Sequence, residues 1–357
     1  MAERSGLKPV PDSSSDVASN DAAPIARARI SARLVIVLER AFLVAGIVLL
    51  GVLIRELGAG AVWGNLRLVG WGFCLIFAQE ILAYAANTFG WYRAFPPPPP
   101  DIPFHRLLAA RIAGDAINAV TPTATVGGEF VRARLLEGQA NMTTVWASVA
   151  VAKVSQTVGQ IAFVVLGLFV VLQDTPLPAG IQRGLFITLL LFSSALLVAL
   201  LMQRRGMVDA GADVLRRLGL PVPQRLGERW QRLDREISRV YERPVSFPIS
   251  VASFFVGWTL GALEIYLIMW FLGIPGGWYR ALTIEVLSVA VDGLLFFVPA
   301  KAGTQEGGKV LIFTLLGLDP AKGLALGLVR RLRDLSWAVV GLLILSRHQL
   351  RKRSGHR

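Results

Sequence analysis

Long apolar stretches, each about as long as a bilayer is thick, recur through most of the 357-residue chain. A lipid core offers no water to backbone N–H and C=O groups, so apolar segments of about 20 residues cross it as α-helices. Those that read as complete spans lie at about 36–57, 66–92, 144–172, 184–202, 247–272 and 321–346. We therefore expect an all-α polytopic membrane protein with about six full spans.

Composition agrees with this expectation and excludes an ordinary soluble enzyme. Hydrophobic residues make up 54% of the chain and charged residues only 17%. The single cysteine, Cys74, excludes an internal disulfide and a cysteine-rich metal cage. His105 is far in sequence from His348 and His356, which lie in a basic tail. We expect no metal site and no cofactor.

Basic residues set the expected orientation. The net charge is +13, and the arginines cluster between apolar segments, where the positive-inside rule and anionic lipids account for them without nucleic acid. The segment 203–246 holds ten arginines against six acids, whereas the loops 173–183 and 273–280 hold one arginine each. We expect the polar, disordered N-terminus (1–34), the 203–246 loop and the basic tail (348–357) to be cytoplasmic. Cleavage of the first apolar segment as a signal peptide is the alternative for the N-terminus.

The cytoplasmic loop contains one amphipathic pattern. Apolar residues recur there at spacings of three and four, with arginines between them: Leu226, Trp230, Leu233, Ile237 and Tyr241. This spacing predicts a helix that lies on the head-group surface and has a structural role.

Two further apolar stretches, 104–137 and 281–318, are interrupted midway by proline and glycine. The interruptions read NAVTPTATVGGEF (118–130) and FFVPAKAGTQEGG (296–308). Non-helical backbone at membrane depth is tolerated only inside protein or beside a water-filled cavity. The pattern favours two re-entrant helical hairpins, and two ordinary spans that end at a Pro-Gly loop remain the alternative.

The two halves of the chain resemble each other. Asp115, Pro122, Glu129 and Lys153 recur, each 177 positions later, as Asp292, Pro299, Glu306 and Arg330. Upstream, QEIL at Glu80 matches LEIY at Glu264. Each copy, at about 66–172 and 247–346, therefore reads as span, broken hairpin, span. Because the opening spans of the copies run in opposite directions, the repeat is inverted, as in many secondary transporters, whose substrate sites lie at the repeat interface.

Polar residues at the two breaks are candidates for binding a substrate. Glycines allow close backbone approach, and cations beside free helix N-termini attract an anionic head group. This set comprises Gly127, Gly128, Glu129, Arg132, Arg134, Pro299, Lys301, Gly303, Glu306, Gly307, Gly308 and Lys309. Snorkelling at the interface is the alternative for Arg132 and Arg134, and simple helix capping is the alternative for the two glutamates.

Carboxylates within apolar helix form a second set of candidates. Asp115 and Asp292 lie two turns before the breaks, and Lys153 and Arg330 are their expected ion-pair partners. Arg331 adds charge beside Arg330 in the last span. The sequence leaves open whether these pairs brace the fold or relay protons.

Three segments carry a resemblance to a known family: VGGEFVRARLL (126–136), VPAKAGTQEGG (298–308) and ALGLVRRLRDLSWAVVGLL (325–343). With them the chain resembles, over roughly 35–347, the flippase-like integral membrane family that includes the transmembrane part of lysylphosphatidylglycerol synthases. It looks most similar to the branch associated with hopanoid biosynthesis. The residues carried over are Gly127, Gly128, Glu129, Arg132, Pro299, Gly303, Glu306, Gly307, Arg330 and Arg331.

The resemblance implies movement of a lipid, a hopanoid or an anionic phospholipid, between leaflets of a bacterial inner membrane. We expect no enzyme activity, and membrane lipids and lipid-biosynthesis enzymes as partners; the placement of the arginines between apolar segments indicates no nucleic acid. Ala300 and Lys301 depart from the glycine that relatives tend to have after the second proline, which stiffens the second break and adds a charge there. The alternatives are a non-catalytic scaffold for lipid-modifying enzymes and an integral membrane lipid transferase.

Overall fold

A computed structural model describes residues 48, 51–52, 54–120, 126–174, 179–204, 224–294 and 303–354. This part of the chain is built from α-helices and contains no β-strand. Several predictions fall outside it: the N-terminal segment 1–34, most of the first span, Pro122, Pro299 and Lys301.

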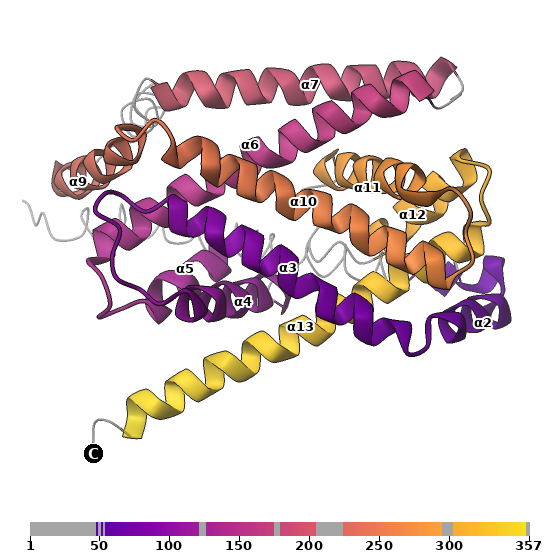
Figure 1. The fold of residues 1–357 in the computed structure, drawn as a ribbon, viewed down its shortest axis with the longest axis horizontal. Helices are drawn as coiled ribbons and strands as arrows, with labels where there is room; N and C mark the ends of the chain where they lie inside the picture. The colour runs from indigo at the N-terminus through magenta and orange to yellow at the C-terminus, as the bar shows by residue number, and fades with distance from the viewer. Residues whose placement is uncertain are drawn as a thin grey trace, which may run out of the picture.

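Eleven helices are described in this part of the chain (Figure 1). In chain order they are α2 (Ala59–Val69), α3 (Gly72–Arg93), α4 (Phe104–Val120), α5 (Val126–Leu135), α6 (Met142–Asp174), α7 (Ala179–Arg204), α9 (Gln224–Tyr241), α10 (Ser246–Phe271), α11 (Gly277–Leu294), α12 (Thr304–Leu315) and α13 (Pro320–Ser354).

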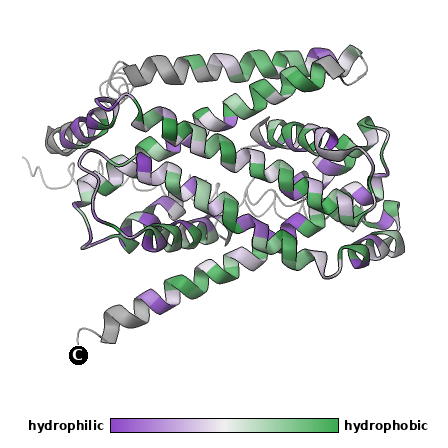
Figure 2. Ribbon diagram, in the orientation of Figure 1, coloured by the Kyte–Doolittle hydropathy of each residue, from purple (hydrophilic) through white to green (hydrophobic). Residues whose placement is uncertain are grey.

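Three of these helices, α3, α6 and α10, are long and apolar enough to cross a membrane, as judged by length and composition over the described residues. They coincide with three predicted spans. The span expected to start at 66 starts instead at Gly72, because Gly70 adopts a positive φ of 41° and ends α2. The predicted spans 184–202 and 321–346 fall within α7 and α13, and α13 carries Arg330, Arg331 and Arg333 near its middle. Figure 2 shows the apolar character of α7 against the polar α9.

α3 and α10 form an antiparallel pair through the middle of the molecule (Figure 1). The Ser250 hydroxyl donates to the Gly90 carbonyl at 2.8 Å, and the Gln79 amide donates to the Leu260 carbonyl at 3.2 Å. Gly72, at the start of α3, lies directly against the Phe271 ring at the end of α10. The contact therefore extends over the whole length of both helices.

α4 and α5 form a first helical hairpin, whose two ends lie side by side. Near the break, the Asn118 amide oxygen accepts from the Gly128 N–H at 2.7 Å. At the other end, Arg106 Nη1 donates to Gln139 Oε1 at 3.2 Å. The end of α4 therefore contacts the start of α5, and the start of α4 contacts the turn after α5, so the two helices are antiparallel.

α11 and α12 form a second hairpin at the opposite end of the molecule (Figure 1). The Gln305 amide donates to Asp292 Oδ2 at 3.0 Å near the break. At the base, Lys322 Nζ donates to the Leu272 carbonyl at 2.8 Å, so the start of α13 lies beside the end of α10. The second hairpin therefore also enters and leaves at one level.

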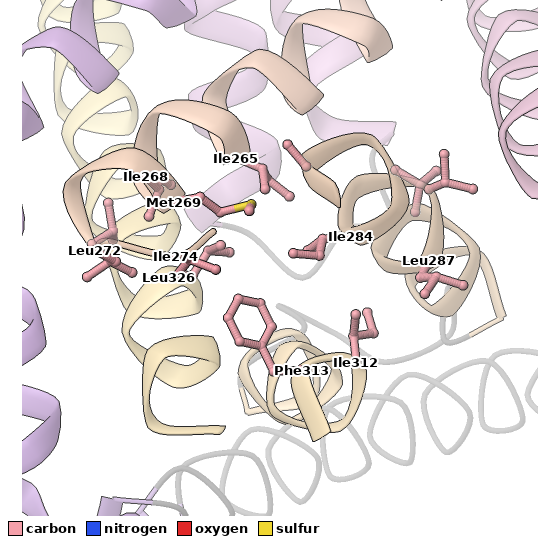
Figure 3. Close-up of a cluster of buried hydrophobic side chains, with 14 of the residues drawn as sticks. Ile265, Ile268, Met269, Leu272, Ile274, Ile284, Leu287, Ile312, Phe313 and Leu326 are labelled. Carbon is pink, nitrogen blue, oxygen red and sulfur yellow. The ribbon is translucent and has the colours of Figure 1, made fainter. Parts of the chain in front are cut away.

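Apolar side chains of α2, α3, α6 and α10–α13 meet around the second hairpin, and Figure 3 shows part of this cluster. The largest fully buried members are Ile76, Leu168, Ile265, Ile268, Met269, Leu272, Ile284 and Phe313. A second cluster around Trp91, Leu107, Leu136 and Phe254 packs the first hairpin against α3, α6 and α10. Each hairpin thus has a core of its own, which within a bilayer is stabilised by van der Waals packing between the helices rather than by removal of apolar surface from water.

α13, a helix of 35 residues, contacts both hairpins. Gly323 and Gly327, in its first half, allow close approach of α12. Gly341, in its second half, lies against Ala116 and the Ile112 carbonyl of α4. Small residues let helix backbones approach closely, and α13 thereby packs along both units.

α9 confirms the predicted amphipathic helix but not its position. Ile237 and Val240 are buried in the cluster around Trp91, with Leu233 and Tyr241 packed against it. The C-terminal half of its apolar face therefore covers protein rather than lipid, because α6 and α10 lie beneath it.

Candidate functional site

Charged residues of the first hairpin form one ion-paired group. Arg132 on α5 is buried and donates to Asp115 on α4, with Glu129 at 3.7 Å. Lys153 Nζ, on α6, lies 3.4 Å from Glu129 Oε1. Arg111, also buried, lies 3.7 Å from Asp115. With three cations to two carboxylates, this group has a formal charge of +1.

Two glycines bring the arms of this hairpin together. A Cβ on Gly128 would lie 2.3 Å from the Gly114 carbonyl oxygen, and one on Gly114 would lie 2.6 Å from Arg132 Cγ. Neither position can hold a side chain without separating the helices. This close approach sets the register in which Arg132 faces Asp115 rather than snorkelling outward, whereas Arg134 is exposed.

Glu306 is the centre of the second hairpin's group. Its Oε2 accepts from the Gly303 N–H at 2.9 Å, which caps the start of α12. Arg331 Nε donates to Glu306 Oε1 at 2.9 Å. The Gly307 N–H bonds to the Gly303 carbonyl at 2.8 Å, and Gly308 packs against Val291. The capping role considered for Glu306 is therefore present, together with an ion pair.

The charged pairs differ from those predicted. Asp115 pairs with Arg132 instead of Lys153, because α4 packs directly on α5. Lys153 pairs with Glu129 of α5, at 3.4 Å. Arg330 binds Glu264 and Glu285 instead of the expected Asp292, because α13 packs on α10, which also contacts α11.

Arg330 and Arg333 hold a network that joins four helices. Arg330 donates to Glu264 at 2.8 Å and to both oxygens of Glu285 at 2.7 and 3.1 Å. Arg333 donates to Glu80 of α3 and lies 3.1 Å from Glu264 of α10. Charges buried in this way are retained only when paired, because an isolated ion in a medium of low dielectric constant costs several kcal/mol.

Glu285 and Arg111 are site residues that the sequence interpretation missed. Glu285 lies in the apolar run TIEVLSVAV of α11, and an intramembrane acid is itself a signal. Glu285 lies about two helical turns before Asp292, away from the break, so its position along the chain does not associate it with the other candidates. Glu80 and Glu264, which the sequence marks as equivalent positions of the repeat, also belong to this network.

Two further predicted residues, Lys309 and Gly127, lie near these groups. Lys309 is buried on α12, with Asp292, Glu285 and Glu264 among its charged neighbours. Gly127 opens the second arm of the first hairpin, next to Gly128. Among the described residues, no group of three or more His, Cys, Asp and Glu side chains is arranged to hold a metal ion.

Apolar helices of membrane-spanning length, with charged side chains paired between them, define an integral membrane protein of the all-α class. The chain belongs to the family of the lysylphosphatidylglycerol synthase TM region, whose family model matches residues 30–342.

One curated relative is similar over most of both chains. It is a UPF0104 membrane protein of Methanothermobacter thermautotrophicus (strain Delta H), 24% identical over 312 residues, which cover 81% of this chain and 89% of the relative. No solved structure matches the chain. The family is thus shown, while membership of a hopanoid-associated branch remains a prediction.

Proposed function

We propose that this protein moves a lipid between the leaflets of a bacterial inner membrane, through a hydrated path lined by the charged groups of the two hairpins. It acts as a translocase and makes no covalent bond. The family is named for the membrane region of enzymes that make a lipid, which supports a lipid-related role.

The hairpin geometry supports re-entrant segments. α4 is 17 residues long and α5 is 10, so at about 1.5 Å per residue they extend about 26 and 15 Å, less than a bilayer core of about 30 Å. The hydrogen bonds from Arg106 to Gln139 and from Lys322 to the Leu272 carbonyl hold the start and the end of each hairpin beside each other. A hairpin that enters and leaves on one side has its break inside the membrane.

Equivalent contacts in the two halves support an inverted repeat. In both, the glutamate after the break pairs with a cation of the following long helix: Glu129 with Lys153, and Glu306 with Arg331. Likewise Asp115 and Asp292 each accept from the opposite arm of their hairpin. The antiparallel opening helices α3 and α10, and the hairpins at opposite ends of the molecule (Figure 1), agree with opposite orientations.

Partly exposed charges in the apolar helices carry the proposal. Lys153 is the only charged residue of the span Met142–Leu172, yet 46% of its side chain is exposed. The side chains of Asp115 and Arg331 are 30% and 28% exposed. A charge facing lipid at the bilayer centre costs about 2.5–3.5 kcal/mol on insertion scales, so such groups line water or a polar ligand.

The charge distribution favours an anionic substrate at the first hairpin. Its group has one cation more than it has carboxylates, with Arg132 and Lys153 on facing helices. Guanidinium and ammonium groups form charge-assisted hydrogen bonds to phosphate oxygens. Anionic phospholipids fit this chemistry better than an uncharged hopanoid.

Reconstituted exchange of a labelled lipid tests the proposal. Purified protein in liposomes should speed the movement of fluorescent phosphatidylglycerol between leaflets, followed by chemical quenching of the outer leaflet. Glu129→Gln and Arg331→Gln, which break one pair in each hairpin, should slow exchange at least about tenfold, an effect of about 1.4 kcal/mol on the barrier. Glu242→Gln, at an exposed position after α9, is the matched control and should exchange lipid normally.

The opposite results separate the alternatives. Unchanged exchange in both variants refutes the site. If the unaltered protein moves no lipid, the translocase is refuted, and loss of function on replacing the 203–246 loop would then favour the scaffold. Covalent modification of an added lipid by the purified protein would indicate the transferase.

A further inference from the structure

A polar hollow opens at the base of the first hairpin, away from both breaks. Its volume is about 690 Å³. Three segments line it: the start of α4, the turn that follows α5, and the distal part of α13. Its charged or potentially charged members are His105, Arg106, Glu137, Arg347 and His348.

These side chains suit a phosphate group. Two guanidinium groups and two imidazoles face one carboxylate, so the hollow is basic even when both histidines are neutral. A guanidinium presents paired N–H donors that match phosphate oxygens, and an imidazole offers an N–H donor in either protonation state.

Hydrogen bonds orient part of this set before any ligand arrives. Arg106 Nη1 donates to Gln139 Oε1 at 3.2 Å, and Gln139 Nε2 donates in turn to the Leu135 carbonyl at 3.3 Å. Side chains held in this way lose less conformational entropy on binding. His105 and Arg106 also lie in the first turn of the 17-residue helix α4, where the helix dipole favours an anion.

The rest of the lining is apolar. Ala109, Ala110, Leu135 and Ile344 form a wall beside the charged groups. A phospholipid head group presents the same combination, a phosphate next to a glycerol and its acyl chains. We infer that this hollow is a binding site for a phosphate anion, taken as the head group of an anionic phospholipid. This inference stands apart from the proposed transport: binding to the hollow is measured directly, and it can succeed or fail whether or not the protein moves lipid.

Direct binding to the full-length chain in a neutral detergent tests the site. The probes are dihexanoyl-phosphatidylglycerol, dihexanoyl-phosphatidylcholine and inorganic phosphate, titrated by thermophoresis. Phosphatidylglycerol should bind, and binding should weaken as salt is added. The zwitterionic phosphatidylcholine should bind at least tenfold more weakly. Competition by inorganic phosphate separates the two sources: displacement of the lipid shows a site that also accepts free phosphate, and no displacement shows one that needs the lipid's glycerol.

Paired variants locate the binding. Arg106→Gln with Arg347→Gln should weaken phosphatidylglycerol binding at least tenfold. The control pair Arg232→Gln with Arg243→Gln removes the same charge at exposed positions elsewhere and should leave Kd within twofold. If the arginine pair fails to fold, His105→Gln with His348→Gln should weaken binding at least threefold. The assignment is overturned if no anionic probe binds, or if the control pair weakens binding as much as the hollow's own pair.

Discussion

Replacing Arg330 by methionine tests the buried network most directly. Arg330 makes three hydrogen bonds to Glu264 and Glu285, whose side chains are almost completely buried. Glu264 keeps Arg333 at 3.1 Å, whereas Glu285 loses the guanidinium that binds both of its oxygens. Removing one partner of a buried pair costs about 3–5 kcal/mol. At about 2 °C per kcal/mol, Arg330→Met should lower Tm by about 6–10 °C.

A thermal melt in detergent, followed by tryptophan fluorescence, measures this loss. Arg330→Met combined with Glu285→Gln removes the unpaired charge, so the double variant should be more stable than Arg330→Met alone by about 2 kcal/mol. Arg243→Met, at an exposed position, should change Tm by less than about 2 °C. An Arg330→Met melt equal to that of the unaltered protein, or a double variant no more stable than the single one, refutes the reasoning.

Three further outcomes follow from single positions. Gly128→Ala should lower stability by about 1–3 kcal/mol, because its Cβ meets the Gly114 carbonyl at 2.3 Å, while Gly184→Ala, which meets nothing within 4 Å, should not. Ser148→Ala removes the acceptor of the buried Trp91 N–H at 3.1 Å and should lower the free energy of unfolding by about 1–3 kcal/mol, measured in the same melts. Cys74, the exposed single cysteine near the start of α3, should react with a membrane-impermeant maleimide from outside intact spheroplasts; labelling only after permeabilisation contradicts the proposed orientation.

Helices were predictable where one physical rule dominates. Apolar length alone located α3, α6 and α10, and the spacing of apolar residues located α9. The surface that α9 covers was not predictable, because the same apolar stripe fits lipid and protein equally well. Burial of Val240 against the protein depends on how α6 and α10 pack beneath it.

Charged residues were found by the same logic, but their pairing was not. An acid or base in apolar helix stands out in the sequence, which identified Asp115, Lys153 and Arg330. Which cation meets which carboxylate depends on helix register to within one turn. In the first hairpin that register follows from the contact of Gly114 with Gly128, which the spacing of charges along the chain does not encode.

α13 makes the two hairpins mechanically dependent on each other. One continuous helix lies against α12 at Gly323 and Gly327 and against α4 at Gly341, with Arg330 and Arg333 clamped between these contacts. A rigid rod that pivots about a clamped centre moves its two ends in opposite directions. A tilt that loosens one hairpin would therefore tighten the other, and with the proposed opposite orientation of the hairpins the path would not open to both sides of the membrane at once.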